Sequence, residues 1–430
     1  MKNSILLIIL IPLLALLSCT KGEGGKKFAR VERGKIFLNG KPYYFMGTNM
    51  WYAAVLASES EGGDTLRLFR ELDFLKELGL HNIRVLVGAE GERGVHSKIE
   101  PVLQPSPGVY NDTLLRGLDR LMVELGKREM TAVLYLGNSW EWSGGYSQYL
   151  MWSGEEDAPI PALAGWIPFR DYVAKFVFCD SCKDMFARHV RFIVSRENSI
   201  TGKPYTEDPA IFSWQVANEP RAFSKEGKEY FYQWVTSVAS LIKSIDSNHM
   251  VSTGSEGLYG CEVDMELYER IHSHPDIDYL NMHIWPYNWG WASKDSILEK
   301  LPYSIAETEK YMESHIQIAE KLNKPLVLEE FGYPRDGFLF ERGSSVEARD
   351  KYFSFISDRL RKSSSEKGAL AGANFWGWGG FADTISGRFD WRRGDPYTGD
   401  PAQEPQGLYS VFASDTTTLE VIRRFGRTSF

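Results

Sequence analysis

Short apolar runs alternate with longer amphipathic stretches along most of this chain. The apolar runs have the length and composition of buried strands, and eight of them occur, at residues 43–49, 82–87, 131–136, 211–216, 250–254, 279–284, 325–330 and 372–376. Helical spacing of apolar residues marks stretches between them, such as 64–79, 114–130 and 229–246. Eight strands that alternate with helices predict an α/β fold of the (β/α)8 barrel type.

The stretch 64–79 illustrates the helical pattern. Asp64 is an expected N-cap, and Gly79 is an expected stop signal. The side predicted to face the core carries Leu66, Phe69, Leu72, Leu75 and Leu78.

Two connections in the predicted barrel are long, at 137–175 and 377–409, after the third and the eighth strand. Both are dense in aromatic residues and glycine. Loops that follow the strands of such a barrel form its active face, so we expect both to border a site. Parts of each are also expected to pack on each other as lids.

Composition narrows the possible ligands. The chain has 430 residues, a net charge of -8 and 13 tryptophans. An acidic chain without a basic stripe is not expected to bind nucleic acid. Flat aromatic surface is what sugar rings stack on, although roughly half of the tryptophans should belong to the core.

The N-terminal segment has the pattern of an export signal. Lys2 precedes an apolar run from Ile5 to Leu17 that is short for a membrane span. The letters LLSC at its end resemble a bacterial lipobox, in which cleavage leaves Cys19 as a lipidated N-terminus. An ordinary signal peptide with an incidental cysteine is the alternative. We expect a signal peptide at 1–18, a flexible tether at 19–27 and a catalytic domain at 28–430. The protein would then be exported and held at the bacterial outer membrane or cell surface by this lipid anchor alone, or otherwise secreted.

The other cysteines do not indicate a metal site. Cys179 and Cys182 form a CxxC motif, but no second pair accompanies it, and Cys261 stands alone. A zinc site is therefore not expected. Cys179 and Cys182 could form a local disulfide or remain two thiols.

Polar and aromatic residues occur where the predicted strands end. They are Arg84, Asn218, Glu219, His283, Trp285, Glu329, Glu330 and Trp376. The carboxyl ends of barrel strands converge on one mouth, where such residues act in catalysis. Each also has a structural explanation, such as an ion pair for Arg84, but together they indicate a site.

Two carboxylates that face each other suffice to cleave a glycosidic bond. One gives a proton to the leaving oxygen, and the other attacks the anomeric carbon or activates water. Glu219 and either Glu329 or Glu330 could form this pair. Neighbours on a regular strand point to opposite faces, so we expect only one of Glu329 and Glu330 to face the mouth.

The motifs WQVANEP, LVLEEFG, MGTNMWY, SWEWSGG, HIWPYNWGW and NFWGWGG resemble glycoside hydrolase family five, specifically its β-mannanase subfamily. The resemblance covers the chain from about residue 28 to its C-terminus. It implies a retaining mechanism, with Glu219 as the acid/base and Glu330 as the nucleophile. Because this pair supplies both proton transfer and nucleophile, and no His/Cys cluster has ligand spacing, neither a metal nor a cofactor is expected. Glu329 would then point outward or sideways in a structural role.

The resemblance also implies roles around this pair. Asn218 would bind the sugar 2-hydroxyl, Arg84 would keep Glu330 ionised, and an anionic Glu330 would favour a protonated Glu219. The remaining candidates are His283 beside the pair, Trp285 in place of the family's frequent tyrosine, Trp376 as the floor for the sugar at the cleavage point, Trp51, Trp140 and Trp142 as platforms along the cleft, and Arg221 as a leaving-side sugar contact or a salt-bridging loop residue.

These features predict a retaining endo-β-1,4-mannanase that acts on mannan, glucomannan or galactomannan. A related β-1,4-glucanase and an exo-acting mannan hydrolase are alternatives, because the sequence does not give the shape of the pocket. A surface lipoprotein that binds glycans without cutting them is an alternative of another class. A binder has no need of both carboxylates, so their presence favours an enzyme.

Overall fold

A computed structural model describes residues 28–426 except 93, 96, 386 and 387. The predicted signal peptide and tether, including Cys19, lie outside the described residues. All eight predicted strands are present and form one parallel sheet in the order β8-β7-β6-β5-β4-β11-β10-β9. Their bounds are β4 (Phe45–Asn49), β5 (Asn82–Leu86), β6 (Thr131–Tyr135), β7 (Ile211–Gln215), β8 (Met250–Ser252), β9 (Leu280–Ile284), β10 (Leu326–Phe331) and β11 (Leu370–Phe375).

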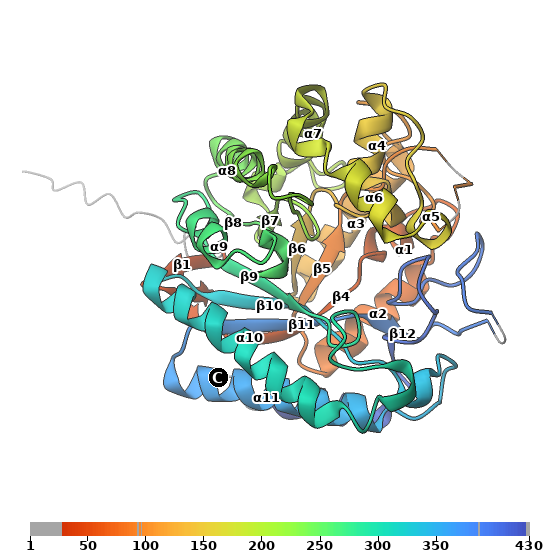
Figure 1. The fold of residues 1–430 in the computed structure, drawn as a ribbon, viewed down its shortest axis with the longest axis vertical. Coiled ribbons are helices and arrows are strands. Elements are labelled where there is room, and N and C mark those ends of the chain that lie inside the picture. Colours follow the sequence, from red (N-terminus) through yellow and green to blue (C-terminus); the bar gives the residue numbers. More distant parts are fainter. Residues whose placement is uncertain (1–27, 93, 96, 386–387, 427–430) are drawn as a thin grey trace, which may run out of the picture.

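The sheet curls into a barrel (Figure 1). β4 pairs with β5 on one side and with β11 on the other, which joins the start of the barrel to its end. At the seam between β8 and β9, the backbone N–H of Asp278 donates to the carbonyl of Val251 at 2.8 Å. The predicted (β/α)8 barrel is thereby confirmed.

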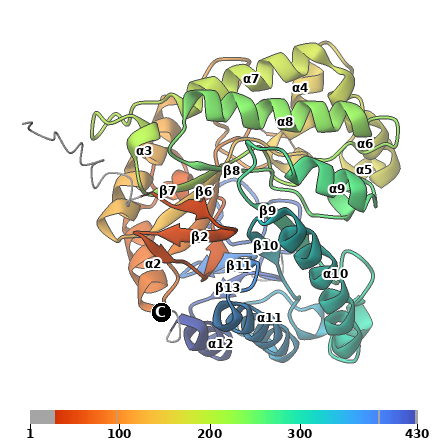
Figure 2. The same ribbon diagram turned by 90° about the vertical axis from the view of Figure 1, so that its left-hand side faces the viewer.

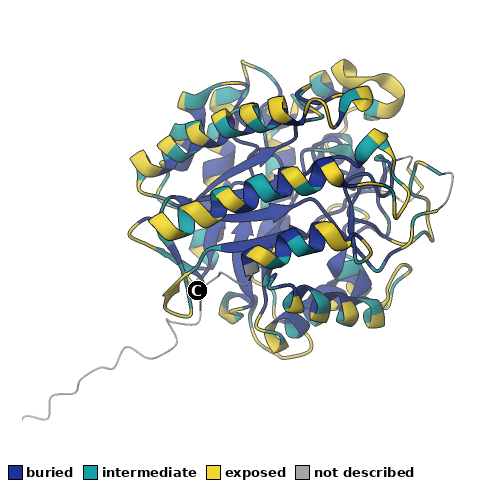
Figure 3. Ribbon diagram, turned by 90° about the horizontal axis from the view of Figure 1, so that it is seen from below, coloured by how far each residue is buried: buried dark blue, intermediate teal, exposed yellow. Residues whose placement is uncertain are grey.

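Helices follow the strands and cover the outside of the barrel. They are α1 (Ala53–Leu56) and α2 (Thr65–Glu77), α3 (Asp112–Lys127), α7 (Asp180–Val194), α8 (Lys228–Ile245), α9 (Met265–His272), α10 (Leu301–Leu322), α11 (Glu347–Glu366) and α12 (Thr416–Gly426). Their exposed faces point to solvent while the strands inside are buried (Figure 3). Within the described part of the chain, no helix combines the length and the apolar character needed to cross a membrane.

Helix α2 begins as predicted but is turned about its axis. The Asp64 side chain caps it by accepting from the Arg67 backbone N–H at 2.9 Å. Leu66 is 74% exposed, whereas the buried positions are Leu68, Glu71, Leu72 and Leu75. The predicted apolar side was therefore wrong at Leu66. The pattern missed Glu71, which is buried because its carboxylate accepts from the Arg67 side chain (2.8 Å) and from the Phe381 backbone (3.1 Å).

An N-terminal hairpin closes the amino end of the barrel (Figure 2). It consists of β1 (Arg30–Glu32), β2 (Lys35–Leu38) and β3 (Lys41–Pro42). Ile36 belongs to a buried apolar cluster with residues from the starts of the barrel strands, including Phe45, Phe212 and Val327. This plug leaves the carboxyl end as the open end of the barrel.

The two long connections lie at that carboxyl end, and both pack against Trp51. The first contains α4 (Gly145–Trp152), α5 (Pro161–Ala164) and α6 (Trp166–Val173), and the second begins with β12 (Trp378–Gly380), which pairs with β13 (Val411–Phe412). The ring of Trp51 packs edge-on against Trp142 from the first connection (5.9 Å) and Tyr397 from the second (5.6 Å). Parts of both connections therefore pack over the barrel, while packing of one connection on the other stays a prediction.

The CxxC motif forms a disulfide between Cys179 and Cys182 at the start of α7, and Cys261 is a buried free thiol. Of the two possibilities that the sequence left open, the structure shows the disulfide.

Candidate active site

Glu219 lies at the carboxyl end of the barrel, four residues after β7 ends at Gln215. Its φ of 48° is in the left-handed region that residues other than glycine rarely adopt. Backbone contacts hold it there: its N–H donates to Gly254 O at 2.9 Å, and Ser139 Oγ donates to its carbonyl at 2.6 Å. This conformation directs the side chain across the mouth of the barrel.

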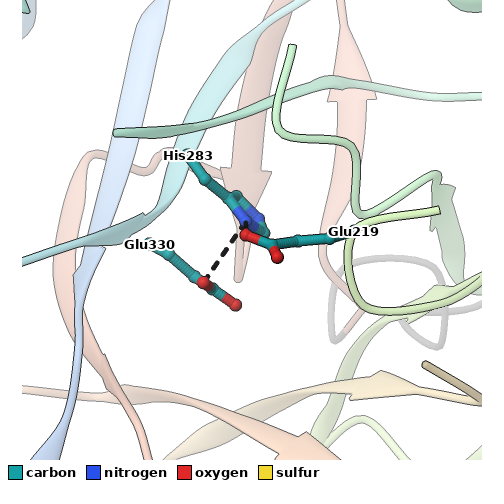
Figure 4. Close-up of side chains that lie close together, drawn as sticks. All are labelled: Glu219, His283 and Glu330. Carbon is teal, nitrogen blue, oxygen red and sulfur yellow. Dashed lines mark hydrogen bonds and ion pairs between the residues drawn. The ribbon is translucent and has the colours of Figure 1, made fainter. Parts of the chain in front are cut away.

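The Glu219 carboxylate has two defined partners. Trp140 Nε1 donates to Oε2 at 2.5 Å, and His283 Nδ1 lies 2.8 Å from Oε1. One oxygen of Glu219, one oxygen of Glu330 and a ring nitrogen of His283 all lie within 4.8 Å of one another. Figure 4 shows the two carboxylates pointing toward each other with the His283 ring beside them. The structure thus brings together the pair that the sequence predicts.

Glu330 is held as an anion by two cationic neighbours. Arg84 donates to its Oε1 at 2.5 Å, and His283 Nδ1 lies 3.3 Å from its Oε2. Burial alone would raise the pKa of Glu330. The charges of His283 and Arg84, together with hydrogen bonds from both, outweigh this effect and hold the pKa below its usual value. An ionised carboxylate is the form that a nucleophile requires.

Glu329 does not point outward or sideways, and that prediction was wrong. Its side chain is fully buried inside the barrel, where Tyr279 Oη donates to it at 2.9 Å and Gln215 Nε2 also donates to it. The pairing of β10 with β9 shifts register between Leu328 and Glu330, which marks a β-bulge. A bulge interrupts the strict alternation of faces, so two consecutive carboxylates both reach the interior.

Arg84 is the centre of the hydrogen-bond network below the mouth. It is fully buried, and besides Glu330 it donates to Gln215 Oε1 (2.8 Å), Asn49 Oδ1 (3.0 Å) and Asn218 Oδ1 (2.8 Å). The guanidinium also lies 4.3 Å from the centre of the Tyr135 ring. Arg84 therefore links the nucleophile to Asn218, the residue next to Glu219.

His283 bridges the two catalytic candidates through one nitrogen. Burial lowers the pKa of its imidazole, but the charge of Glu330 and the hydrogen bond with Glu219 reverse this and raise the pKa to about 9. His283 is therefore protonated at neutral pH. Its positive charge stabilises a negative charge on the carboxylates beside it.

Two tryptophans form an aromatic wall along the strand of the nucleophile. The Trp285 ring packs edge-on against Trp376 (6.0 Å) and Tyr409 (5.1 Å), and the backbone N–H of Trp376 donates to Phe331 O at 2.8 Å. Both tryptophans are buried, with 9% and 4% of their surface exposed. Stacking of a sugar on Trp376 and a substrate contact of Trp285 stay predictions.

The three tryptophans predicted as platforms lie in different settings. Trp140 is next to the site through its bond to Glu219, and its ring packs against Trp166 at 5.7 Å. Trp51 and Trp142 pack against each other and are only 4% and 3% exposed, so little of either ring remains for a sugar to stack on.

Arg221 forms ion pairs, which is the alternative role that its sequence position allows. It contacts Glu256 Oε2 at 3.1 Å and Glu262 Oε1 at 3.5 Å, and it donates to Tyr259 O at 2.7 Å. A contact with the leaving-side sugar stays a prediction.

Three buried carboxylates on the loops above the site were not predicted from the sequence. Burial and the charge of Glu219 raise the pKa of Glu256 to about 8, although Arg221 opposes this. Burial raises the pKa of Glu141 to about 7. Burial and the neighbouring charges of Asp400, Glu330 and Glu219 raise the pKa of Glu404 well above its usual range. No spacing in the sequence marks them, because they come from three separate loops.

The spacing of Glu219, His283 and Glu330 would also allow them to surround a metal ion. Their other contacts argue against this use. Arg84 already neutralises Glu330, and a protonated His283 has no lone pair to give to a metal. We therefore expect that prolonged treatment with EDTA followed by desalting leaves activity unchanged. Loss of activity that added Zn²⁺ or Ca²⁺ restores would contradict this expectation.

A parallel (β/α)8 barrel with two close glutamates at the carboxyl ends of its strands defines a glycoside hydrolase. The comparison with protein families agrees. Residues 26–428 match the model described as "GH family 5 beta-mannosidase-like", so the chain belongs to glycoside hydrolase family 5.

Named relatives and solved structures point in the same direction. The chain is 31% identical to a putative mannan endo-1,4-beta-mannosidase 9 of Oryza sativa subsp. japonica over 81% of either chain, and 28% identical to mannan endo-1,4-beta-mannosidase 1 of Arabidopsis thaliana over 79% of either chain. A family 5 mannosidase from Rhizomucor miehei, solved in complex with mannosyl-fructose, is 30% identical with a TM-score of 0.86, covering 94% of this chain and 97% of that one.

Proposed function

We propose that this protein is a retaining hydrolase of β-1,4-linked mannan that cleaves internal bonds. One observation carries the mechanism: an oxygen of Glu219 and an oxygen of Glu330 lie within 4.8 Å of each other. Retaining enzymes hold their carboxyl groups about 5–5.5 Å apart, whereas inverting enzymes leave about 6.5–9.5 Å for a water molecule. The short separation favours direct attack by a carboxylate.

The reaction proceeds in two displacements. In the first, Glu330 attacks the anomeric carbon while Glu219 protonates the departing oxygen, which breaks the glycosidic bond and forms a glycosyl-enzyme. In the second, Glu219 removes a proton from water, and the resulting hydroxide displaces Glu330 from the sugar. Two inversions restore the original configuration. Arg84 and His283 keep Glu330 anionic before the attack and after its release.

Mannan as the substrate is supported by the relatives. Several proteins that match most of this chain carry the name mannan endo-1,4-beta-mannosidase. The test is hydrolysis of mannan, glucomannan, galactomannan and cellulose, with products followed over time. Rapid loss of viscosity and a ladder of manno-oligosaccharides are expected from the first three. Equal activity on cellulose, or no release from any mannan, would overturn the proposal.

A second candidate function is removal of single mannose units from a chain end. The Oε2 atom of Glu404 is buried and has no hydrogen-bond partner among the described residues, and the side chain lies close enough to Glu219 and Glu330 to interact with their charges. A buried carboxylate oxygen without a partner is costly, and sugar hydroxyls could satisfy it. The loop that carries Glu404 also carries Tyr397, whose ring packs against Trp51.

The same time course separates the two candidates. An exo-acting enzyme releases mannose from the first minutes and leaves the viscosity of mannan almost unchanged. In that case Glu404→Gln should lower kcat/KM for short oligosaccharides more than it lowers kcat. Early release of larger oligosaccharides would exclude exo action.

We also propose that the protein is exported and lipidated on Cys19. The support is the short apolar run that ends in LLSC. Several acyl chains on one residue anchor a protein firmly, whereas one chain binds only marginally. Cells that express the protein should incorporate a fatty-acid analogue into it, and Cys19→Ala should prevent incorporation. Labelling of the variant equal to that of the wild type would contradict lipidation at this residue.

A further inference from the structure

Glu329 is a buried carboxylate below the site that the two-glutamate mechanism does not use. It is fully buried in the barrel interior, and its Oε2 lies 3.7 Å from Arg84 Nε. Its two oxygens accept hydrogen bonds from Tyr279 and Gln215. Burial raises its pKa above the usual value, and the charges of Arg84 and His283 together with these hydrogen bonds limit this rise without reversing it.

The contacts of Glu329 lead to the nucleophile through Arg84. Gln215 Nε2 donates to Glu329, which leaves Gln215 Oε1 to accept from Arg84 Nε at 2.8 Å. Another nitrogen of the same guanidinium, Nη1, donates to Glu330 at 2.5 Å. Arg84 therefore lies between the carboxylates of Glu329 and Glu330. By accepting from the Gln215 amide, Glu329 also orients the Gln215 oxygen toward Arg84.

Within the cluster formed by Arg84, His283 and the three glutamates Glu219, Glu329 and Glu330, the charges balance only when Glu329 is included. Arg84 and protonated His283 contribute two positive charges. Glu330 contributes one negative charge, and Glu219 must be neutral to act as an acid. An ionised Glu329 supplies the second negative charge. Without it, a net positive charge would face Glu219 and favour loss of its proton.

We propose that Glu329 is a positioning residue: its anion holds Arg84 between two carboxylates and offsets one of the two positive charges beside the catalytic pair. This proposal deepens the proposed function and rests on it. Glu329 does not touch the substrate and acts through Arg84. It would thereby set the pH range in which Glu330 is ionised while Glu219 still carries its proton.

Other titratable groups face the same region. They are Arg84 on β5, Tyr135 on β6, Tyr279 directly before β9, His283 on β9, Glu330 on β10, and Glu141, Arg221, Glu256 and Glu404 on the loops above. Burial moves the pKa of both tyrosines upward, so they stay neutral. Arg221 pairs with Glu256. A substitution of Glu329 alone leaves all of these groups in place.

The test is the pH profile of kcat/KM on a β-1,4-manno-oligosaccharide. In Glu329→Gln the nucleophile ionises more easily, so the acidic limb should move to lower pH. The acid/base also loses its proton more easily, so the alkaline limb should move the same way. We expect both limbs to shift by about one pH unit. Glu329→Asp keeps the charge and should leave both limbs near their wild-type positions.

A matched control removes a buried carboxylate elsewhere. Asp119 is also fully buried, and it accepts hydrogen bonds from Arg196 and Tyr205. Neither of these residues contacts Glu219 or Glu330. Asp119→Asn should lower stability without moving either limb. If Glu329→Gln does not fold, Glu329→Met, of similar volume, takes its place.

The outcomes separate this proposal from the proposed function. A wild-type protein that cleaves no β-mannoside would refute the function. An active wild type whose limbs stay fixed in Glu329→Gln would overturn the role of Glu329 alone. That role would also be overturned if Glu329→Asp shifts the limbs as far as Glu329→Gln, or if neither charge-removing variant folds, because packing would then explain the residue.

Discussion

Replacing Glu330 by alanine is expected to abolish cleavage of every β-mannoside, with a loss of about 10⁴-fold or more in kcat. The reason is that no other described carboxylate both faces Glu219 and is held ionised by Arg84 and His283. Without this nucleophile no glycosyl-enzyme forms, whatever the leaving group. The measurement is initial rate on mannan and on an activated aryl β-mannoside.

The matched control for this variant is Glu124→Ala, which removes a carboxylate on α3 that pairs with Arg128 and Lys127. It should retain wild-type activity. Full activity of Glu330→Ala would refute the assignment of the nucleophile.

Glu219→Ala should behave differently from Glu330→Ala. It should be inactive on mannan, whose leaving group needs a proton, and yet form the glycosyl-enzyme from an activated aryl β-mannoside. Azide should then accelerate turnover and yield β-mannosyl azide, because azide attacks the intermediate without help from a base. An azide product of α configuration would contradict the retaining mechanism.

The barrel could be predicted from sequence because its signal is local and repeated. Each of the eight strands is a short apolar run, and the helix after it has periodic apolar residues. The pair Glu219 and Glu330 could also be predicted, since Glu219 lies shortly after the end of β7, Glu330 lies near the end of β10, and both carboxyl ends meet at the mouth of the barrel.

The orientation of Glu329 could not be predicted, because it depends on a bulge. The alternation of faces along β10 fails where its pairing with β9 slips by one residue. Nothing in the letters LVLEEFG shows that slip. A similar limit applies to Glu71 in α2, whose burial depends on hydrogen bonds from Arg67, from the Trp378 indole and from the backbone of Phe381, which is 310 residues away in the sequence.

The surroundings of the site depend on the long loops, whose shapes have no periodic signal. Trp51 and Trp142 are residues of the type that sugar rings stack on, yet Tyr397 from the second connection packs against Trp51. Glu404 comes from the same connection, and only the fold brings it beside Glu219 and Glu330. The choice between an open cleft and a closed pocket is therefore a property of loops rather than of the catalytic motifs.

Arg84→Met should lower both activity and stability by large amounts. Arg84 is fully buried and donates to four side chains, among them Glu330 and Asn218. Removing one partner of a buried ion pair costs about 3–5 kcal/mol, because the remaining charge is left without compensation. Here Glu329 and Glu330 would both lose their ion pair with Arg84, and Glu330 would keep only His283 as a cationic neighbour. Activity on mannan should fall by about 10³-fold or more, since the nucleophile would be partly protonated and Asn218 would lose its anchor.

Replacing Arg84 by lysine, which keeps the charge, should not restore activity or stability. The single ammonium of Arg84→Lys cannot donate in four directions, so most of the loss should remain. Arg196→Met, which breaks an ion pair with Asp119, provides the control for destabilisation alone and should keep near wild-type kcat/KM at 25 °C.

A double-mutant cycle measures the interaction between Arg84 and Glu330. Thermal and denaturant unfolding of Arg84→Met, Glu330→Gln and the double variant should show strong coupling, with the double variant more stable than the sum of the single losses predicts. The physical reason is that neutralising Glu330 removes one of the charges that Arg84→Met leaves buried. Additive losses would mean that Arg84 stabilises the barrel through Gln215 and Asn49 rather than through the nucleophile.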